Sequence, residues 1–246
     1  MRTLLFAALL WMIAPLVFGA HPLVTDDPGT QGRGNQQIEA NTDWARQRDA
    51  SAHIGSFTYT YGALDTLDVF LSAPQAFNAP SGLEDMSLGA KWRFHESETL
   101  SLAIEPQLFL PTGDETKSLG NGKTSMALTG ILAYDTAPWR LLGNLALLVN
   151  RYKLQADRDA NHSVIWRTSM SIWRILNHEW KLVSDMGIQR SVEKAADSNP
   201  GFLLAGFIYS PTPHLDLDAG VKFGLQCGAC TAVPKRQGGV GLTVRF

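Results

Sequence analysis

Two adjacent carboxylates and three glycines lie close together in HPLVTDDPGTQGRGNQQIE, residues 21–39. The acids are Asp26 and Asp27, and the next glycines are Gly29, Gly32 and Gly34. Such a loop could bind a metal ion through oxygen ligands or a phosphate through backbone N–H groups. No helical pattern follows it, which argues against a phosphate loop. The further oxygen ligands of a calcium loop are missing, so we expect neither a metal nor a cofactor here.

Cys227 and Cys230 form the motif CGAC and are the only two cysteines of the chain. A C-x-x-C motif can be a redox centre or half of a zinc site. Zinc usually takes four ligands, and the sequence has no second cysteine pair. In an oxidising compartment the pair is expected to form a local disulfide that pins its loop.

A third group of reactive side chains is NHSV, with His162 and Ser163 next to each other. Such a pair could serve a lipid hydrolase, which needs a nucleophile beside a histidine base. Neighbouring residues on a strand point to opposite faces, so His162 and Ser163 would not readily touch. We therefore expect a polar rim and no enzyme, with a lipid hydrolase as the less favoured alternative.

The elements that position these groups begin after a secretory signal. Residues 1–20 have Arg2, an apolar stretch and then Gly19 and Ala20, which is typical of a signal peptide cleaved after either residue. The formal net charge of −2 gives no reason to expect a nucleic-acid partner. No later run of about 18 apolar residues is present, so no spanning helix is expected.

Hydrophobicity alternates with a period of two along almost the whole mature chain. In HLDLDAGVKFGL, residues 214–225, every second residue is apolar and the others are mostly polar. This alternation predicts a strand with one apolar and one polar face. At about 12 residues the strand exceeds the usual five or six of soluble proteins and suits a tilted membrane crossing.

Twelve segments share this pattern, and they are 35–46, 51–61, 65–73, 84–95, 99–110, 123–134, 138–151, 162–175, 179–190, 201–210, 213–225 and 236–246. The second, third and tenth are the weakest; in the tenth we place Leu203, Ala205, Phe207 and Tyr209 outward, although the other phase fits almost as well. Short turns alternate with longer loops. This asymmetry predicts an all-β, antiparallel up-and-down transmembrane barrel over residues 35–246, with short periplasmic turns and longer external loops.

Aromatic residues near the segment ends support a membrane barrel over a soluble sandwich. Interfacial girdles of tryptophan and tyrosine flank the apolar band of such barrels. The chain also ends in Phe246 on the apolar phase. The aromatic residues near segment ends are Trp44, Trp92, Tyr134, Trp139, Trp166 and Trp180.

The polar faces of the segments carry charges that would line the lumen. We expect opposite charges to pair across it, either filling the interior or forming a polar pathway whose charges set selectivity. A twelve-stranded lumen is narrow enough for either outcome. The residues assigned to it are Asp68, Asp85, Lys91, Arg93, Glu105, Arg140, Arg167, Lys181, Asp185, Asp216, Asp218, Lys222 and Arg245.

The glycine-rich stretch lies between the signal peptide and the first strand. We expect residues 21–34 to turn into the periplasmic mouth as a plug, with Asp26 and Asp27 meeting lumen cations such as Arg245 or Lys181. The alternative interpretation is a disordered tether.

Several motifs resemble those of a known family. The opening stretch, GLEDMSLGAKWRF, LPTGD, YSPTPHLDLDAGVKFGL and GLTVRF are similar to the outer-membrane proteins linked with the meta-pathway of phenol degradation, while CGAC departs from that pattern. The resemblance spans His21 to Phe246. It implies a barrel in the bacterial outer membrane, surrounded by lipid, that admits small organic compounds as a transporter. It leaves the oligomeric state open.

Overall fold

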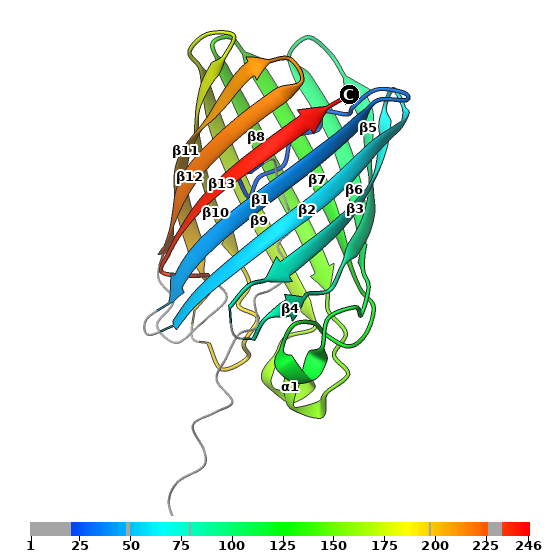
Figure 1. The fold of residues 1–246 in the computed structure, drawn as a ribbon, viewed down its shortest axis with the longest axis vertical. Coiled ribbons are helices and arrows are strands. Elements are labelled where there is room, and N and C mark those ends of the chain that lie inside the picture. The colour runs from blue at the N-terminus through cyan, green and yellow to red at the C-terminus, as the bar shows by residue number, and fades with distance from the viewer. Residues whose placement is uncertain (1–20, 48–49, 79, 197, 226–232) are drawn as a thin grey trace, which may run out of the picture.

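The chain forms a closed antiparallel β-barrel (Figure 1). The structure is a computed structural model that describes residues 21–47, 50–78, 80–196, 198–225 and 233–246. The expected signal peptide, residues 1–20, and the expected disulfide between Cys227 and Cys230 lie outside these residues.

Twelve long strands make the wall, as the sequence predicts. Each pairs antiparallel with the next along the chain, and the first strand closes the barrel on the last. The wall strands are β1 (Gln36–Gln47), β2 (Ala50–Leu64), β3 (Leu67–Ala76), β5 (Ser87–Glu96), β6 (Leu100–Phe109), β7 (Ser125–Thr136), β8 (Trp139–Val149), β9 (Val164–Ile175), β10 (Trp180–Gln189), β11 (Gly201–Thr212), β12 (Leu215–Leu225) and β13 (Arg236–Arg245).

One extra strand, β4 (Gly82–Leu83), pairs with the end of β3. β3 also pairs with β5, so β4 and β5 line up along the same neighbour. The residues between them, 84–86, leave the ladder, so the strand predicted over 84–95 begins three residues later, at Ser87. This insertion gives the loop end of the barrel an irregular rim.

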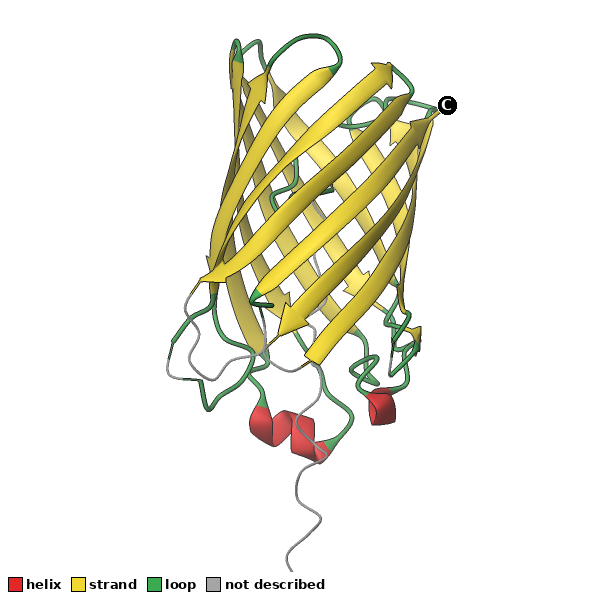
Figure 2. Ribbon diagram, turned by 60° about the vertical axis from the view of Figure 1, so that its left-hand side comes forward, coloured by secondary structure: helices red, strands yellow, loops and turns green. Residues whose placement is uncertain are grey.

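The two ends of the barrel differ as expected. Short turns join the strands at the end where the chain terminates, and the longer connections lie at the other end, which also has the short connection between β1 and β2. Figure 2 shows both helices, η1 (Glu115–Lys117) and α1 (Gln155–Ala160), at this second end. Within the described residues, no helix is long and apolar enough to span a membrane.

The strand faces follow the predicted phase, apolar outside and mostly polar inside. Along β7 burial alternates residue by residue, with Met126 and Leu128 exposed and Ala127 and Thr129 buried. The uncertain tenth segment also takes the expected phase, because Leu203 and Phe207 are exposed in β11. Leu204 and Ile208 of the same strand are apolar yet face inward, which explains why the two phases look alike in the sequence.

Candidate functional site

The N-terminal segment, residues 21–34, lies inside the barrel. In Figure 1 it is the dark-blue trace that runs behind β1 and β13. At the turn end it is held by the β2–β3 turn, where the Thr30 hydroxyl donates to the Asp65 carbonyl over 2.8 Å. The Gly34 N–H donates to the Gly62 carbonyl over 2.8 Å. From this anchor the segment runs back toward the middle of the lumen.

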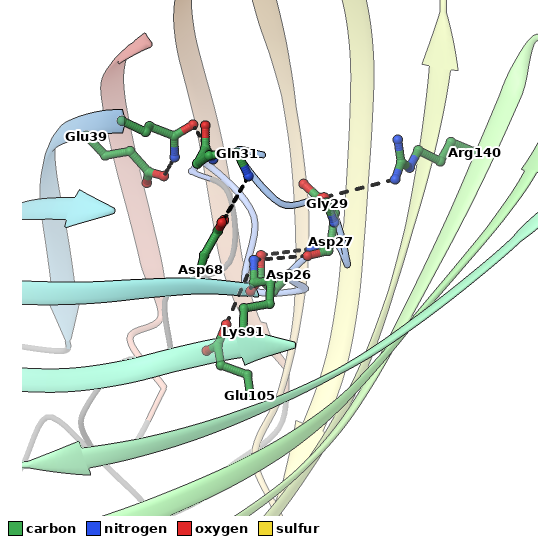
Figure 3. A network of polar contacts seen from close by, with 10 residues as sticks. Asp26, Asp27, Gly29, Gln31, Glu39, Asp68, Lys91, Glu105 and Arg140 are labelled. Atoms are coloured by element: carbon green, nitrogen blue, oxygen red, sulfur yellow. Dashed lines mark hydrogen bonds and ion pairs between the residues drawn. The ribbon is translucent and has the colours of Figure 1, made fainter. Parts of the chain in front are cut away.

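A buried ion cluster fixes the segment to the wall at mid-height (Figure 3). The Lys91 Nζ of β5 lies 2.8 Å from Oδ2 of Asp26 and 3.8 Å from Oε2 of Glu105 on β6. It also donates to the Asp27 carbonyl over 3.0 Å. All three charged side chains are largely buried. The ammonium group of Lys91 therefore contacts a wall carboxylate and the segment together, and little water is present to screen the attraction.

Wall carboxylates accept hydrogen bonds from the backbone of the segment on two further sides. Asp185 of β10 accepts from the N–H groups of Val24 (2.7 Å) and Thr25 (2.8 Å) and from the Thr25 hydroxyl (2.7 Å). Asp68 of β3 accepts from the Gln31 N–H at 3.1 and 3.0 Å. An irregular backbone buried inside the barrel needs such partners, because a buried N–H group without a hydrogen bond is costly.

His21 reaches the opposite wall. Its imidazole Nδ1 bonds Asp218 of β12, and its Nε2 lies 3.6 Å from Asp43 of β1. Burial alone would lower the pKa of His21, but the two carboxylates outweigh it and raise this pKa to about 9. At neutral pH the ring is therefore an imidazolium held between two acids.

An apolar contact completes the docking. Leu23 packs in a buried cluster on the lumen side, which also contains Ala133, Leu142, Trp173, Val183, Phe202, Leu204 and Ile208. Beside it, Pro22 lies against Gly220 of β12, where an added Cβ would come within 2.6 Å of the proline. Close approach of another group to the backbone is a common reason for a glycine within a strand.

Five of the expected lumen charges lie toward the turn end. Lys181 donates to the Ser210 hydroxyl over 2.9 Å. Arg245 bonds the carboxylate of Asp216 at 2.8 Å. Arg93 lies 3.0 Å from Glu96. Arg140 lies 4.0 Å from the Asp27 carboxylate. The Lys181 and Arg245 contacts join neighbouring strands, the Arg140 contact joins the wall to the segment, and the Arg93 contact lies within β5.

Asp26 and Asp27 meet cations of the lumen face, but not the two given as examples. Asp26 lies against Lys91, and the Asp27 carboxylate lies 4.0 Å from Arg140. Arg245 instead bonds Asp216, and Lys181 bonds the Ser210 hydroxyl. The wall acids Asp68, Asp185 and Asp218 bond the segment and do not pair with cations across the lumen.

Asp85 is also placed differently from the expectation. It precedes β5, in the insertion at the loop end, and its carboxylate accepts from the N–H groups of Gly113 (3.0 Å) and Asn121 (2.8 Å). It therefore organises the loop after β6 and is not part of the polar lumen face of a strand.

Two buried cations lie on the loop side of the segment. Arg167 of β9 donates from Nε to the Gln189 side chain over 2.9 Å, and its Nη1 has no hydrogen-bond partner within the described part of the chain. Lys222 of β12 is 6 % exposed and lies 6.0 Å from the Phe202 ring centroid. Neither has a carboxylate within 4.0 Å among the described residues. The loop-side lumen therefore holds two cations without a direct carboxylate partner in the described part of the chain.

A cavity of about 750 Å³ occupies the turn side of the lumen. The N-terminal segment lines it through Asp27, and the wall contributes Phe70, Lys91 and Trp173. It reaches the turn residues His178 and Pro213. Its lining is mostly polar and charged, with Phe70 and Trp173 adding aromatic surface, and its volume is sufficient for a small organic molecule.

Sequence reasoning missed the residues that receive the segment. Asp43, Gly220 and Gly241 contact His21 or Pro22, or would do so if a Cβ were added. The signal was available: glycines recur on the polar face of the last two segments, where a wall facing water would carry side chains. Among the described residues, no group of three or more metal-ligating side chains is present.

The candidate hydrolase pair is separated in its loop. The His162 N–H donates to the Val192 carbonyl, while the Ser163 carbonyl accepts from Asn150. Over the described residues no hydrogen bond joins the two side chains.

The family model described as "Putative MetA-pathway of phenol degradation" matches residues 21–246. The chain belongs to this family. The match covers the N-terminal segment as well as the barrel, so the family resemblance of the opening motif is confirmed. A search of curated proteins finds no match.

Solved structures similar to this family member are outer-membrane barrels. The COG4313 outer membrane channel from Pseudomonas putida F1 is 12% identical, with a TM-score of 0.67, over 89% of this chain and 98% of that one. The NanC porin is 9% identical, with a TM-score of 0.63, over 86% of this chain and 100% of that one. The KdgM porin is 8% identical, with a TM-score of 0.61, over 85% of this chain and 99% of that one. At these identities the likeness concerns the fold. Fold and family place the protein in the bacterial outer membrane.

Proposed function

We propose that the protein is a channel for small organic solutes whose lumen is narrowed by the N-terminal segment. The observation that carries the proposal is the cavity of about 750 Å³ between that segment and the turn end. A barrel with only a structural role would be stabilised by a filled interior, whereas this one keeps open space lined by both aromatic and charged residues. The family description and the similar channels and porins support the same function.

The segment acts as a partial plug in this proposal. Its contacts reach β2, β3, β5, β10 and β12, so it crosses the lumen and does not follow one wall. We assign the selectivity of the loop-side half to Arg167 and Lys222, whose buried charges favour anions.

We further propose that the protein is not an enzyme. A lipid hydrolase needs a nucleophile hydrogen-bonded to its base. His162 and Ser163 instead use their backbones to connect strands and loops. Turnover of a lipid substrate by purified protein, abolished by Ser163→Ala, would contradict this part of the proposal.

Single-channel recording in planar bilayers tests the function. The refolded protein should conduct, and deletion of residues 22–33 should raise its conductance. Arg167→Glu should shift the reversal potential in a salt gradient toward cation preference, because the substitution reverses a buried lumen charge. A small aromatic solute should reduce the ionic current while it occupies the cavity. Absence of conductance in both the full protein and the deletion variant would overturn the proposal.

A further inference from the structure

Two arginines face each other on the outside of the barrel, at the seam between the first and last strands. Arg46 of β1 and Arg236 of β13 are partners in the strand register, and both side chains are exposed. Arg46 lies on the same outward strand face as Trp44, and Arg236 on the same outward face as Val240; the two apolar residues are 51% and 45% exposed. Both lie at the loop end of their strands, which is the external end of the barrel.

Directly opposed side chains on neighbouring strands have Cβ atoms about 5 Å apart, and like charges at such positions repel. In the described part of the chain, no carboxylate lies within 4.0 Å of either guanidinium. The repulsion is relieved if an anion lies between the two groups. Two guanidinium groups present several N–H donors, which suits the oxygens of a phosphate group particularly well.

The surface below the arginines indicates what carries that phosphate. Phe223 of β12 is the register partner of Arg236 and is 53% exposed. Val221, two residues further into the membrane, is 46% exposed. Together with Trp44 and Val240 they form an apolar face beneath the charged pair. A free phosphate makes no favourable contact with this apolar face, whereas a lipid can pack its acyl chains along it.

We propose that Arg46 and Arg236 bind a phosphate group of a glycolipid in the outer leaflet, with its acyl chains on the face formed by Trp44, Val221, Phe223 and Val240. Lipid A, a phosphorylated and acylated disaccharide, has the required chemistry. The site is separate from the lumen, so it would hold the barrel in its leaflet whether or not the protein conducts. It adds a specific lipid to the general membrane surroundings of the fold.

Native mass spectrometry of the folded barrel in detergent tests the proposal. Bis-phosphorylated lipid A should remain bound to the wild type, and Arg46→Gln with Arg236→Gln should weaken binding by roughly tenfold, as expected for loss of charge-assisted hydrogen bonds. The matched control is Arg174→Gln. Arg174 is an outward arginine at the turn end, stacked 4.7 Å from the Trp139 ring centroid, and its replacement should leave lipid A binding unchanged.

Two further arms separate the sources of phosphate and guard against misfolding. Dephosphorylated lipid A should bind weakly, and inorganic phosphate should compete poorly. Arg236→Glu places an acid opposite Arg46, so this variant should fold at least as stably as the wild type and still lose lipid A. Equal binding by the wild type and Arg236→Glu, an equal loss in Arg174→Gln, or full displacement by inorganic phosphate would overturn the proposal.

Discussion

At the scale of single residues, the buried charges of the lumen are stabilised by shared partners. Lys91 serves Asp26 and Glu105 together, and all three are largely buried. Removing one member of a buried ion pair is costly because the remaining charge stays desolvated. The wall and the segment therefore depend on each other at this point, even though they are far apart in the sequence.

We expect Lys91→Gln to destabilise the barrel by about 3 kcal/mol, the lower end of the range for breaking a buried pair. The measurement is urea unfolding followed by tryptophan fluorescence in detergent. Adding Glu105→Gln should recover part of the loss, since one orphaned carboxylate is then removed. Lys153→Gln breaks an exposed pair with Glu115 and serves as the control, with little change expected. A loss no larger than that of the control would contradict the prediction.

His21 makes a second residue-scale prediction, which concerns pH. Its pKa is about 9 in the folded protein against 6.5 for the free side chain, so the folded state binds the proton more tightly. The stabilisation is fully present below pH 6.5 and is lost as pH rises through 9. The midpoint temperature of thermal unfolding should therefore decrease as the pH is raised from 6.5 to 9.

His21→Gln should lack that decrease and should already be less stable at pH 6. The groups that face the imidazole are the carboxylates of Asp43 and Asp218. The same decrease in wild type and variant would assign the pH dependence to another group.

At the scale of elements, strand faces are shaped to receive the N-terminal segment. β12 presents Gly220 where Pro22 approaches, and β11 presents Leu204 and Ile208 to the cluster around Leu23. The wall thus departs from a simple polar-inside pattern where the segment docks. These departures made the tenth segment ambiguous in the sequence.

Gly220→Val should displace the segment without touching any charge. Its Cβ would lie within 2.6 Å of Pro22, so the proline must move. We expect limited proteolysis to cut within residues 21–34 faster than in the wild type. Gly238→Val is the matched control, because a Cβ at Gly238 meets nothing within 4 Å. Equal cleavage rates in the two variants would argue against tight docking at Gly220.

At the scale of the whole molecule, the sequence is sufficient to predict the barrel but not the contacts that the N-terminal segment makes inside it. Strand alternation is a local property, so Met126 and Leu128 reveal their outward face without knowledge of the neighbours. The partners of Asp26 depend on how deep the segment runs, which no local pattern records. The insertion at Asp85 was missed for a related reason: its carboxylate is satisfied by loop backbone, which has no periodicity to read.

The pairing of β1 with β13 has a consequence for how the molecule forms. Gln37 and Arg245 are bonded across 208 positions of sequence, and bringing such distant residues together is entropically costly and slow. Until β13 arrives, two strand edges remain unpaired, and lipid cannot satisfy their backbone groups. Completion of the wall and entry into the hydrocarbon layer must therefore be coupled. Because the N-terminal segment is directly continuous with β1, we expect it to be enclosed as this last pairing forms.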